Sequence, residues 1–99
     1  MTFWDSLKKP FFVLAPMADV TDPAYRRLIA EYWKPDVTWT EFVSADGLYH
    51  TRTKGIMTDE ENPLVRDLQF GESERPIVAQ LFGANPETMA YAAKYAASL

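Results

Sequence analysis

Two short stretches of the chain hold residues whose types and spacing could support ligand chemistry. Residues 14–23 and 76–83 each join an apolar run to a polar or glycine-bearing loop, and a helix start signal follows. In parallel α/β proteins, ligands bind where strands stop and helices begin. The candidate site residues are therefore Pro16, Met17, Ala18 and Gln80. Pro16 lacks an N–H group and ends a strand, while the Gln80 amide offers both a donor and an acceptor.

Other kinds of chemistry are excluded by residue types that the sequence lacks. The 99 residues include no cysteine, which excludes a disulfide, a thiolate metal site and a cysteine nucleophile within them. No set of His, Asp and Glu has metal-site spacing, and His50 is interpreted as a surface residue. A net charge of −4 without a basic run indicates that these residues alone do not hold nucleic acid.

The sequence shows neither a membrane helix nor a signal peptide. No apolar run approaches the ~20 residues that a membrane-spanning helix needs. The first residues lack the basic, apolar and small-residue succession of a secretory leader. We therefore expect a cytoplasmic protein without a membrane partner.

Three apolar runs predict the strands of a parallel sheet, at residues 11–15, 37–43 and 77–82. Asp22-Pro23 and Asn85-Pro86 predict two helices, because each joins a capping side chain to a proline at the first helical position. The order of strands and helices predicts an α/β fold with right-handed crossovers.

The pattern is weaker between the second and third strands. A brief helix is predicted near residues 45–49, a short extra strand at 64–70, and a solvated turn at 71–75. The acid-rich stretch 59–74 is interpreted as a solvated face, and the three tryptophans as packing residues. The first helix is predicted to bury one apolar stripe, at Tyr25, Leu28, Ile29, Tyr32 and Trp33.

Three blocks of residues together resemble the start of the tRNA-dihydrouridine synthases, in the order and at the spacing of that family. They are Ala15-Pro16-Met17-Ala18-x-Val20-Thr21-Asp22 with Arg26, Thr40-Glu41-x-Val43-Ser44-Ala45, and Pro76-x-x-x-Gln80-Leu81-Phe82-Gly83 with Pro86-Glu87. Two departures are mild. Asp19 stands where the commonest family version has Gly, and Ala24-Tyr25 replaces Pro-Phe.

The resemblance implies that residues 1–99 are a partial FMN-binding domain, about three βα units from the N-terminal portion of a TIM (β/α)8 barrel. Such barrels need ~250 residues, so the later strands and a helical RNA-binding domain would lie outside this fragment. FMN would lie beside Pro16, Met17 and Ala18, with the Gln80 amide at its polar edge. Glu41 would lie near the flavin or the substrate uridine.

The resemblance also implies a reaction. NADPH reduces FMN, a hydride passes to a uridine in tRNA, and a cysteine on a later loop supplies the proton. That cysteine would lie beyond Leu99, so no catalytic residue is expected within the chain, and the chain alone is expected to be inactive. The tRNA would bind through regions absent here, and no metal is implied.

Alternatives remain open at this level. Another FMN-dependent barrel oxidoreductase, of dihydroorotate or ene-reductase type, would share the first block. A non-catalytic module could instead cover its open sheet by forming an oligomer. Gln80 could be a polar plug, Met17 a core residue, and Glu41 the partner of a nearby basic side chain. Asp22 is interpreted as a helix cap rather than a ligand.

Overall fold

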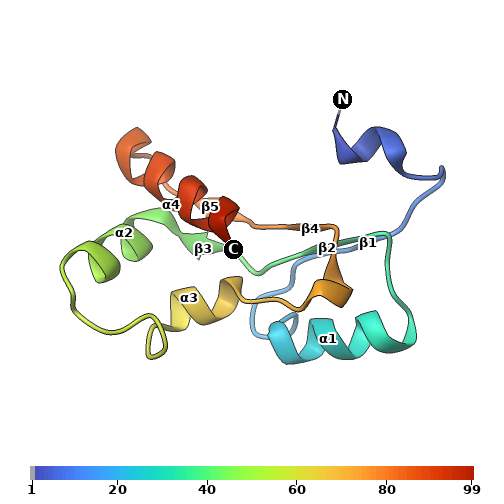
Figure 1. Ribbon diagram of the computed structural model, residues 1–99, viewed down its shortest axis with the longest axis horizontal. Coiled ribbons are helices and arrows are strands. Elements are labelled where there is room, and N and C mark those ends of the chain that lie inside the picture. Colours follow the sequence, from blue (N-terminus) through green and yellow to red (C-terminus); the bar gives the residue numbers. More distant parts are fainter. Residues whose placement is uncertain (1) are drawn as a thin grey trace.

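The computed structural model describes residues 2–99 and shows a mixed α/β arrangement with parallel strands (Figure 1). Five short strands are present among these residues: β1 (Val13–Leu14), β2 (Val37–Trp39), β3 (Val43–Ser44), β4 (Ile77–Val78) and β5 (Leu81–Phe82). The α-helices are α1 (Pro23–Tyr32), α2 (Ala45–Thr53), α3 (Pro63–Leu68) and α4 (Pro86–Ser98). Two 3₁₀ turns, η1 (Phe3–Ser6) and η2 (Glu72–Glu74), complete the described elements. The α/β class predicted from the sequence is confirmed.

The strands form two parallel groups that follow one another along the chain. One group has the order β1-β2-β4, and the other pairs β3 with β5. Trp39 lies opposite Val78, whereas Val43 lies opposite Leu81. Four residue steps from β2 to β3 therefore face three residue steps from β4 to β5. This mismatch is a bulge of one residue, and it divides each of the predicted strands 37–43 and 77–82 in two.

Helices α1 and α4 begin at the predicted pairs of a capping residue and a proline, and α3 begins at a third pair of this kind. The Asp22 side chain accepts a hydrogen bond from the Tyr25 N–H at 2.8 Å, and Asn85 accepts one from the Glu87 N–H at 2.9 Å. Asn62 does the same for Leu64 at 3.0 Å, with a proline at the first helical position. The prediction of a strand at 64–70 is therefore wrong, because Asn62-Pro63 starts α3 there.

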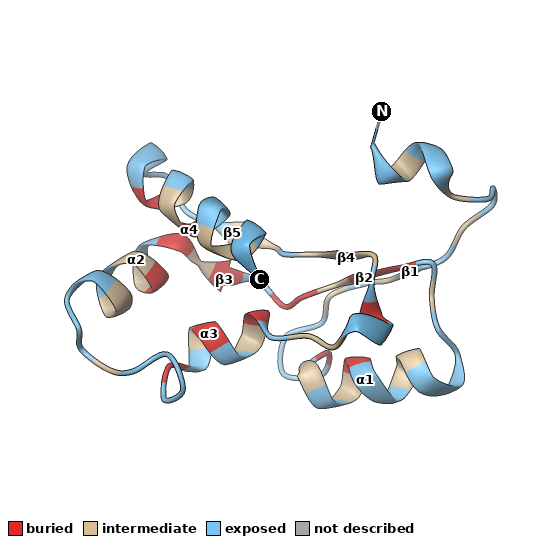
Figure 2. Ribbon diagram, in the orientation of Figure 1, coloured by how far each residue is buried: buried red, intermediate tan, exposed pale blue. Residues whose placement is uncertain are grey.

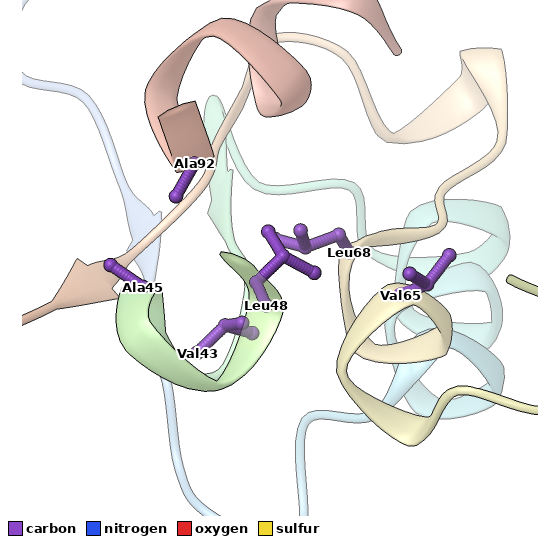
Figure 3. Packing of buried hydrophobic residues seen from close by; sticks show 6 residues of the cluster. All are labelled: Val43, Ala45, Leu48, Val65, Leu68 and Ala92. Atoms are coloured by element: carbon purple, nitrogen blue, oxygen red, sulfur yellow. The ribbon is translucent and has the colours of Figure 1, made fainter. Parts of the chain in front are cut away.

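The apolar core lies between the β3–β5 pair and helices α2, α3 and α4 (Figures 1 and 3). Leu48 of α2 and Leu68 of α3 point toward one another in its centre (Figure 3). The cluster of buried residues comprises Val43, Ala45, Leu48, Val65, Leu68 and Ala92. The brief helix predicted near 45–49 is thus confirmed and extends to Thr53, because its first turn packs into this core.

Helix α1 buries only part of the predicted apolar stripe: Tyr25 and Ile29 are half-buried, and the other members are exposed. Leu28, Tyr32 and Trp33 are 53%, 66% and 80% exposed, and the buried residue of the helix is Arg26. Figure 2 shows the contrast between this exposed helix and the buried segments of α2 and α3. Trp33 is therefore not the packing residue that the sequence predicted.

The described residues include no helix with the length and apolarity needed to cross a membrane.

Candidate functional site

The loop between β1 and α1 is folded into a compact turn by its own polar groups. The Met17 carbonyl accepts hydrogen bonds from the N–H groups of Val20 and Thr21, both at 3.0 Å. The buried Thr21 hydroxyl lies 2.9 Å from the Met17 nitrogen and 3.1 Å from its carbonyl oxygen. Met17 and Ala18 are left exposed at the tip of this turn. The turn therefore presents two of the predicted site residues to solvent.

Asp19 occupies a backbone conformation that few side chains adopt, with φ of 63°. Short polar residues such as Asp tolerate this left-handed region better than most, which explains how Asp19 replaces the Gly of the related pattern. The Glu41 carboxylate accepts a hydrogen bond from the Asp19 N–H. Glu41 thus binds the backbone of the turn, and the interpretation of Glu41 as the partner of a basic side chain is wrong.

Gln80 lies between β4 and β5, opposite the bulge, and both of its backbone groups form hydrogen bonds. Its N–H donates to the Thr40 hydroxyl at 3.0 Å, and its carbonyl accepts from the Val43 N–H at 2.9 Å. Thr40 is buried and completes the ladder where the bulge interrupts it. No hydrogen bond joins the Gln80 side-chain amide to another of residues 2–99. The amide is therefore available to a ligand.

The predicted site residues follow the carboxyl ends of three neighbouring strands. Pro16, Met17 and Ala18 follow β1, Glu41 follows β2, and Gln80 follows β4, in a sheet of order β1-β2-β4. Adjacent strands lie about 4.8 Å apart, so the outer two strands are separated by about 10 Å. The structure brings these residues to one edge of the sheet, as the sequence predicted, with Glu41 in between.

A charged cleft of about 760 Å³ opens beside Glu41. Its walls include Ala18 and Phe42, and its charged side chains are those of Asp19, Asp22, Arg27, Glu41, Arg66 and Asp67. Burial raises the pKa of Asp67 above its usual value; the Arg66 and Arg26 guanidinium groups oppose this shift, and Asp19 and Asp22 reinforce it. Four carboxylates against two guanidinium groups make this cleft a poor site for a phosphate.

Behind the turn lies a buried ion pair that sequence reasoning missed. Arg26 contacts Glu74 at 2.9 Å, with both side chains 0% exposed. The same guanidinium donates to the carbonyls of Thr21 at 2.8 Å and Gln69 at 2.7 Å, and Glu74 also accepts from the Gly71 N–H at 2.7 Å. The interpretation of residues 71–75 as a solvated turn is wrong for Glu74. The available signal was Arg26 itself, a member of the first sequence block that lies off the apolar stripe.

Two residues were predicted to have no catalytic or ligand-binding role, Asp22 as a helix cap and His50 as a surface residue, and the structure agrees. Asp22 is the N-cap of α1, and His50 is exposed, with its ring 5.2 Å from that of Tyr49. Across residues 2–99, no three side chains of the His, Cys, Asp and Glu types are gathered so that they could hold a metal ion.

The fold places the chain among α/β proteins with parallel strands, and the candidate residues follow the carboxyl ends of those strands. A sequence model of the dihydrouridine synthase family matches residues 13–99, and the chain belongs to that family. The resemblance of its three sequence blocks is confirmed.

Similar proteins carry the same family name. The chain is 42% identical over 85 residues to the Bacillus subtilis (strain 168) protein called probable tRNA-dihydrouridine synthase 2. It is 41% identical over the same length to the probable tRNA-dihydrouridine synthase of Staphylococcus aureus (strain COL). Each alignment covers 86% of this chain and 24% of the relative, so the chain spans about a quarter of the length of these relatives. No solved structure matches the chain.

Proposed function

We propose that this chain is the flavin-binding first part of a tRNA-dihydrouridine synthase, which reduces uridine in tRNA to 5,6-dihydrouridine with FMN as cofactor and NADPH as reductant. One observation carries the proposal. In a chain of this family, the exposed turn at Pro16, Met17 and Ala18 lies on the same sheet edge as the unbonded amide of Gln80.

The proposal includes the architecture. We propose that residues 1–99 form a partial domain, the first three βα units of a (β/α)8 barrel, which needs ~250 residues to close. The support is the parallel order β1-β2-β4, in which successive segments of the chain add on one side. In such barrels the site lies at the carboxyl ends of the strands, where these candidate residues lie.

The residues of this edge fit the chemistry of a flavin. A flat apolar ring suits the exposed Met17 thioether and Ala18 methyl group, while the alternating N–H and C=O groups of its rim suit an amide that can both donate and accept. The about 10 Å between the outer strands matches a tricyclic ring laid across the edge. Pro16, Met17, Ala18 and Gln80 would hold the cofactor.

When bound, FMN supplies the redox chemistry, in which electrons from NADPH pass to the uridine ring. The part played by this chain is to bind and orient. The Pro16–Ala18 turn would support the ring, and Gln80 would fix its rotation. The 99 residues include no cysteine, so under this proposal the cysteine that supplies the proton would belong to another part of the enzyme. The acidic balance of −4 likewise favours tRNA contacts outside them.

The test is a chimera in which residues 13–99, the part that matches the family model, replace the corresponding segment of the Bacillus subtilis relative. We expect the purified chimera to bind FMN and to form dihydrouridine on unmodified tRNA with NADPH. The 99-residue chain alone should form none. Gln80→Ala in the chimera should weaken FMN binding, because the ring then loses its amide partner.

Gln69→Ala is the matched control, since Gln69 is exposed at the end of α3 and its hydrogen bonds are made by its backbone N–H and carbonyl, which alanine keeps. It should leave FMN affinity unchanged. A folded chimera that binds no FMN, or that loses the same affinity with Gln69→Ala as with Gln80→Ala, would contradict the proposed site.

A further inference from the structure

We infer that Glu41 is a positioning residue, which holds the turn at residues 17–21 in place through the backbone N–H of Asp19 and does not act through its charge. The inference deepens the proposed function, because that turn carries two of the proposed flavin contacts. The claim that Glu41 holds the backbone of the turn rests on the structure alone and can be tested without the cofactor.

The first step is the contact itself. Glu41 is 9% exposed, and its carboxylate accepts from the Asp19 N–H across 22 residues of sequence. Asp19 has φ of 63°, a conformation that persists when surrounding groups hold it. Removing the acceptor would leave this N–H without its partner in a partly buried place. The Glu41 contact therefore stabilises the least favourable backbone conformation in the turn.

The second step is the origin of the Glu41 position. Glu41 lies in the bulge between β2 and β3, where four steps along one strand face three along the other. Bulges bend a strand and redirect its side chains. The buried Thr40 hydroxyl stabilises this bulge by accepting from the Gln80 N–H and lying 3.0 Å from the Glu41 carbonyl. One bulge thus places both Glu41 and the backbone of Gln80.

The third step is that other contacts hold the opposite end of the same turn. The Thr21 hydroxyl closes it onto Met17, and the Arg26 guanidinium holds the Thr21 carbonyl at 2.8 Å. Arg26 is fixed in turn by the buried Glu74. Within residues 2–99, Glu41 supplies the one hydrogen bond from a distant segment to the middle of the turn, so its loss should loosen residues 18–20 specifically.

The test compares three variants of the 99-residue chain by amide hydrogen exchange. Glu41→Ala removes the acceptor, Glu41→Asp keeps the charge but shortens the side chain, and Glu41→Gln keeps length and acceptor without charge. We expect exchange at Asp19 to accelerate by about ten- to hundredfold in the Ala and Asp variants. The Gln variant should retain most of the protection.

Amides of α4, around Ala92, report whether each variant is folded, and their protection should not change. Glu31→Ala, which removes an exposed carboxylate from α1, is the matched control and should leave Asp19 unaffected. Should Glu41→Ala fail to fold, the Asp and Gln variants still decide the question. Unchanged exchange in Glu41→Asp, or equally fast exchange in Glu41→Gln and Glu41→Asp, would overturn the inference.

FMN titration of the same proteins separates this inference from the proposed function. If the native chain binds FMN, Glu41→Asp should bind it more weakly and Glu41→Gln nearly as well, and equal affinity in all three would refute the positioning role. If exchange follows the expected order while no protein binds FMN, the positioning of the turn stands and the proposed flavin site in this chain fails.

Discussion

The β3–β5 region and the α1 region of this molecule are held together by opposite means. The β3–β5 region, made of β3, β5, α2, α3 and α4, encloses a cluster of apolar side chains. The α1 region, made of β1, α1 and η2, has two buried helical residues, Arg26 of α1 and Glu74 of η2, and the ion pair between them is its internal link. Leu48 in the first region is 0% exposed, whereas Leu28 in the second is 53% exposed.

The difference bears on function because the site turn belongs to the α1 region. An apolar core tolerates small shifts, since its contacts are non-directional. Hydrogen bonds constrain distance and angle together. The turn at residues 17–21 is held by contacts of the second kind, from Thr21, Glu41 and Arg26. Directional polar contacts therefore set the geometry of the site.

The largest expected effect comes from breaking the buried pair. Arg26→Ala leaves the Glu74 carboxylate buried without its partner, and we expect a loss of about 3–5 kcal/mol in the free energy of unfolding. Urea denaturation followed by circular dichroism measures it. Replacing both partners with apolar residues, Arg26→Met with Glu74→Leu, should recover most of the loss. If the single variant costs less than a surface substitution, the α1 region is not held by this pair.

The next effect tests the apolar core. Leu48→Ala should lower the free energy of unfolding by about 2–5 kcal/mol, because it removes a fully buried side chain and leaves a cavity. Leu28→Ala is the matched control in the α1 region and should change stability by about 0.5 kcal/mol or less. Equal losses in the two variants, measured by the same urea titrations, would show that the two regions do not differ as described.

Local sequence signals predicted much of this structure and failed where the decisive partner is distant. Capping residues followed by proline located α1 and α4, and β-branched runs located the main strands, since both signals act within a few residues. Glu74 was misplaced because its partner, Arg26, lies 48 residues away. Part of the apolar stripe of α1 is exposed, contrary to the prediction. Apolar periodicity identifies a helix face that can be buried, but it does not show whether another element covers that face.

In the candidate site, too, positions set by local signals could be predicted from the sequence, whereas a contact between distant residues could not. The positions of Pro16 and Gln80 at strand ends could be predicted, because parallel strands align their carboxyl ends. Their contact with a flavin stays a prediction. The hydrogen bond from Asp19 to Glu41 could not be read from the sequence, since it depends on a bulge of one residue.

A smaller expected effect on stability comes from the two asparagine N-caps, which differ in burial. Asn62 is 1% exposed, caps α3 and donates to the Thr51 hydroxyl at 2.8 Å, whereas Asn85 caps α4 at the surface. Asn85→Ala should cost about 1 kcal/mol, the usual value of a cap. Asn62→Ala should cost about 1–2 kcal/mol more, because it also removes the hydrogen-bond donor to the half-buried Thr51 hydroxyl. Thermal unfolding of both variants checks the order, which an equal cost would contradict.

The smallest effect is the acid dependence of a surface pair in the β3–β5 region. The Arg52 guanidinium holds the pKa of Asp59 below its usual value of 3.8 through hydrogen bonds at 2.9 and 3.0 Å. A lowered carboxyl pKa contributes stability above the unfolded value, and this contribution is lost as the pH falls below about 4. The pair is partly exposed, so the effect is small. Asp59→Asn should flatten the fall in melting temperature between pH 5 and about pH 2, and an unchanged slope would exclude the contribution.

The most direct test of the strand-end site is a titration of the folded 99-residue chain with FMN, followed by flavin fluorescence. We expect saturable binding of one FMN per chain, weakened by Gln80→Ala and retained by Gln69→Ala. A chain that shows its native circular dichroism spectrum but binds no FMN, or that binds it equally well without the Gln80 amide, would contradict a flavin site at this edge of the sheet.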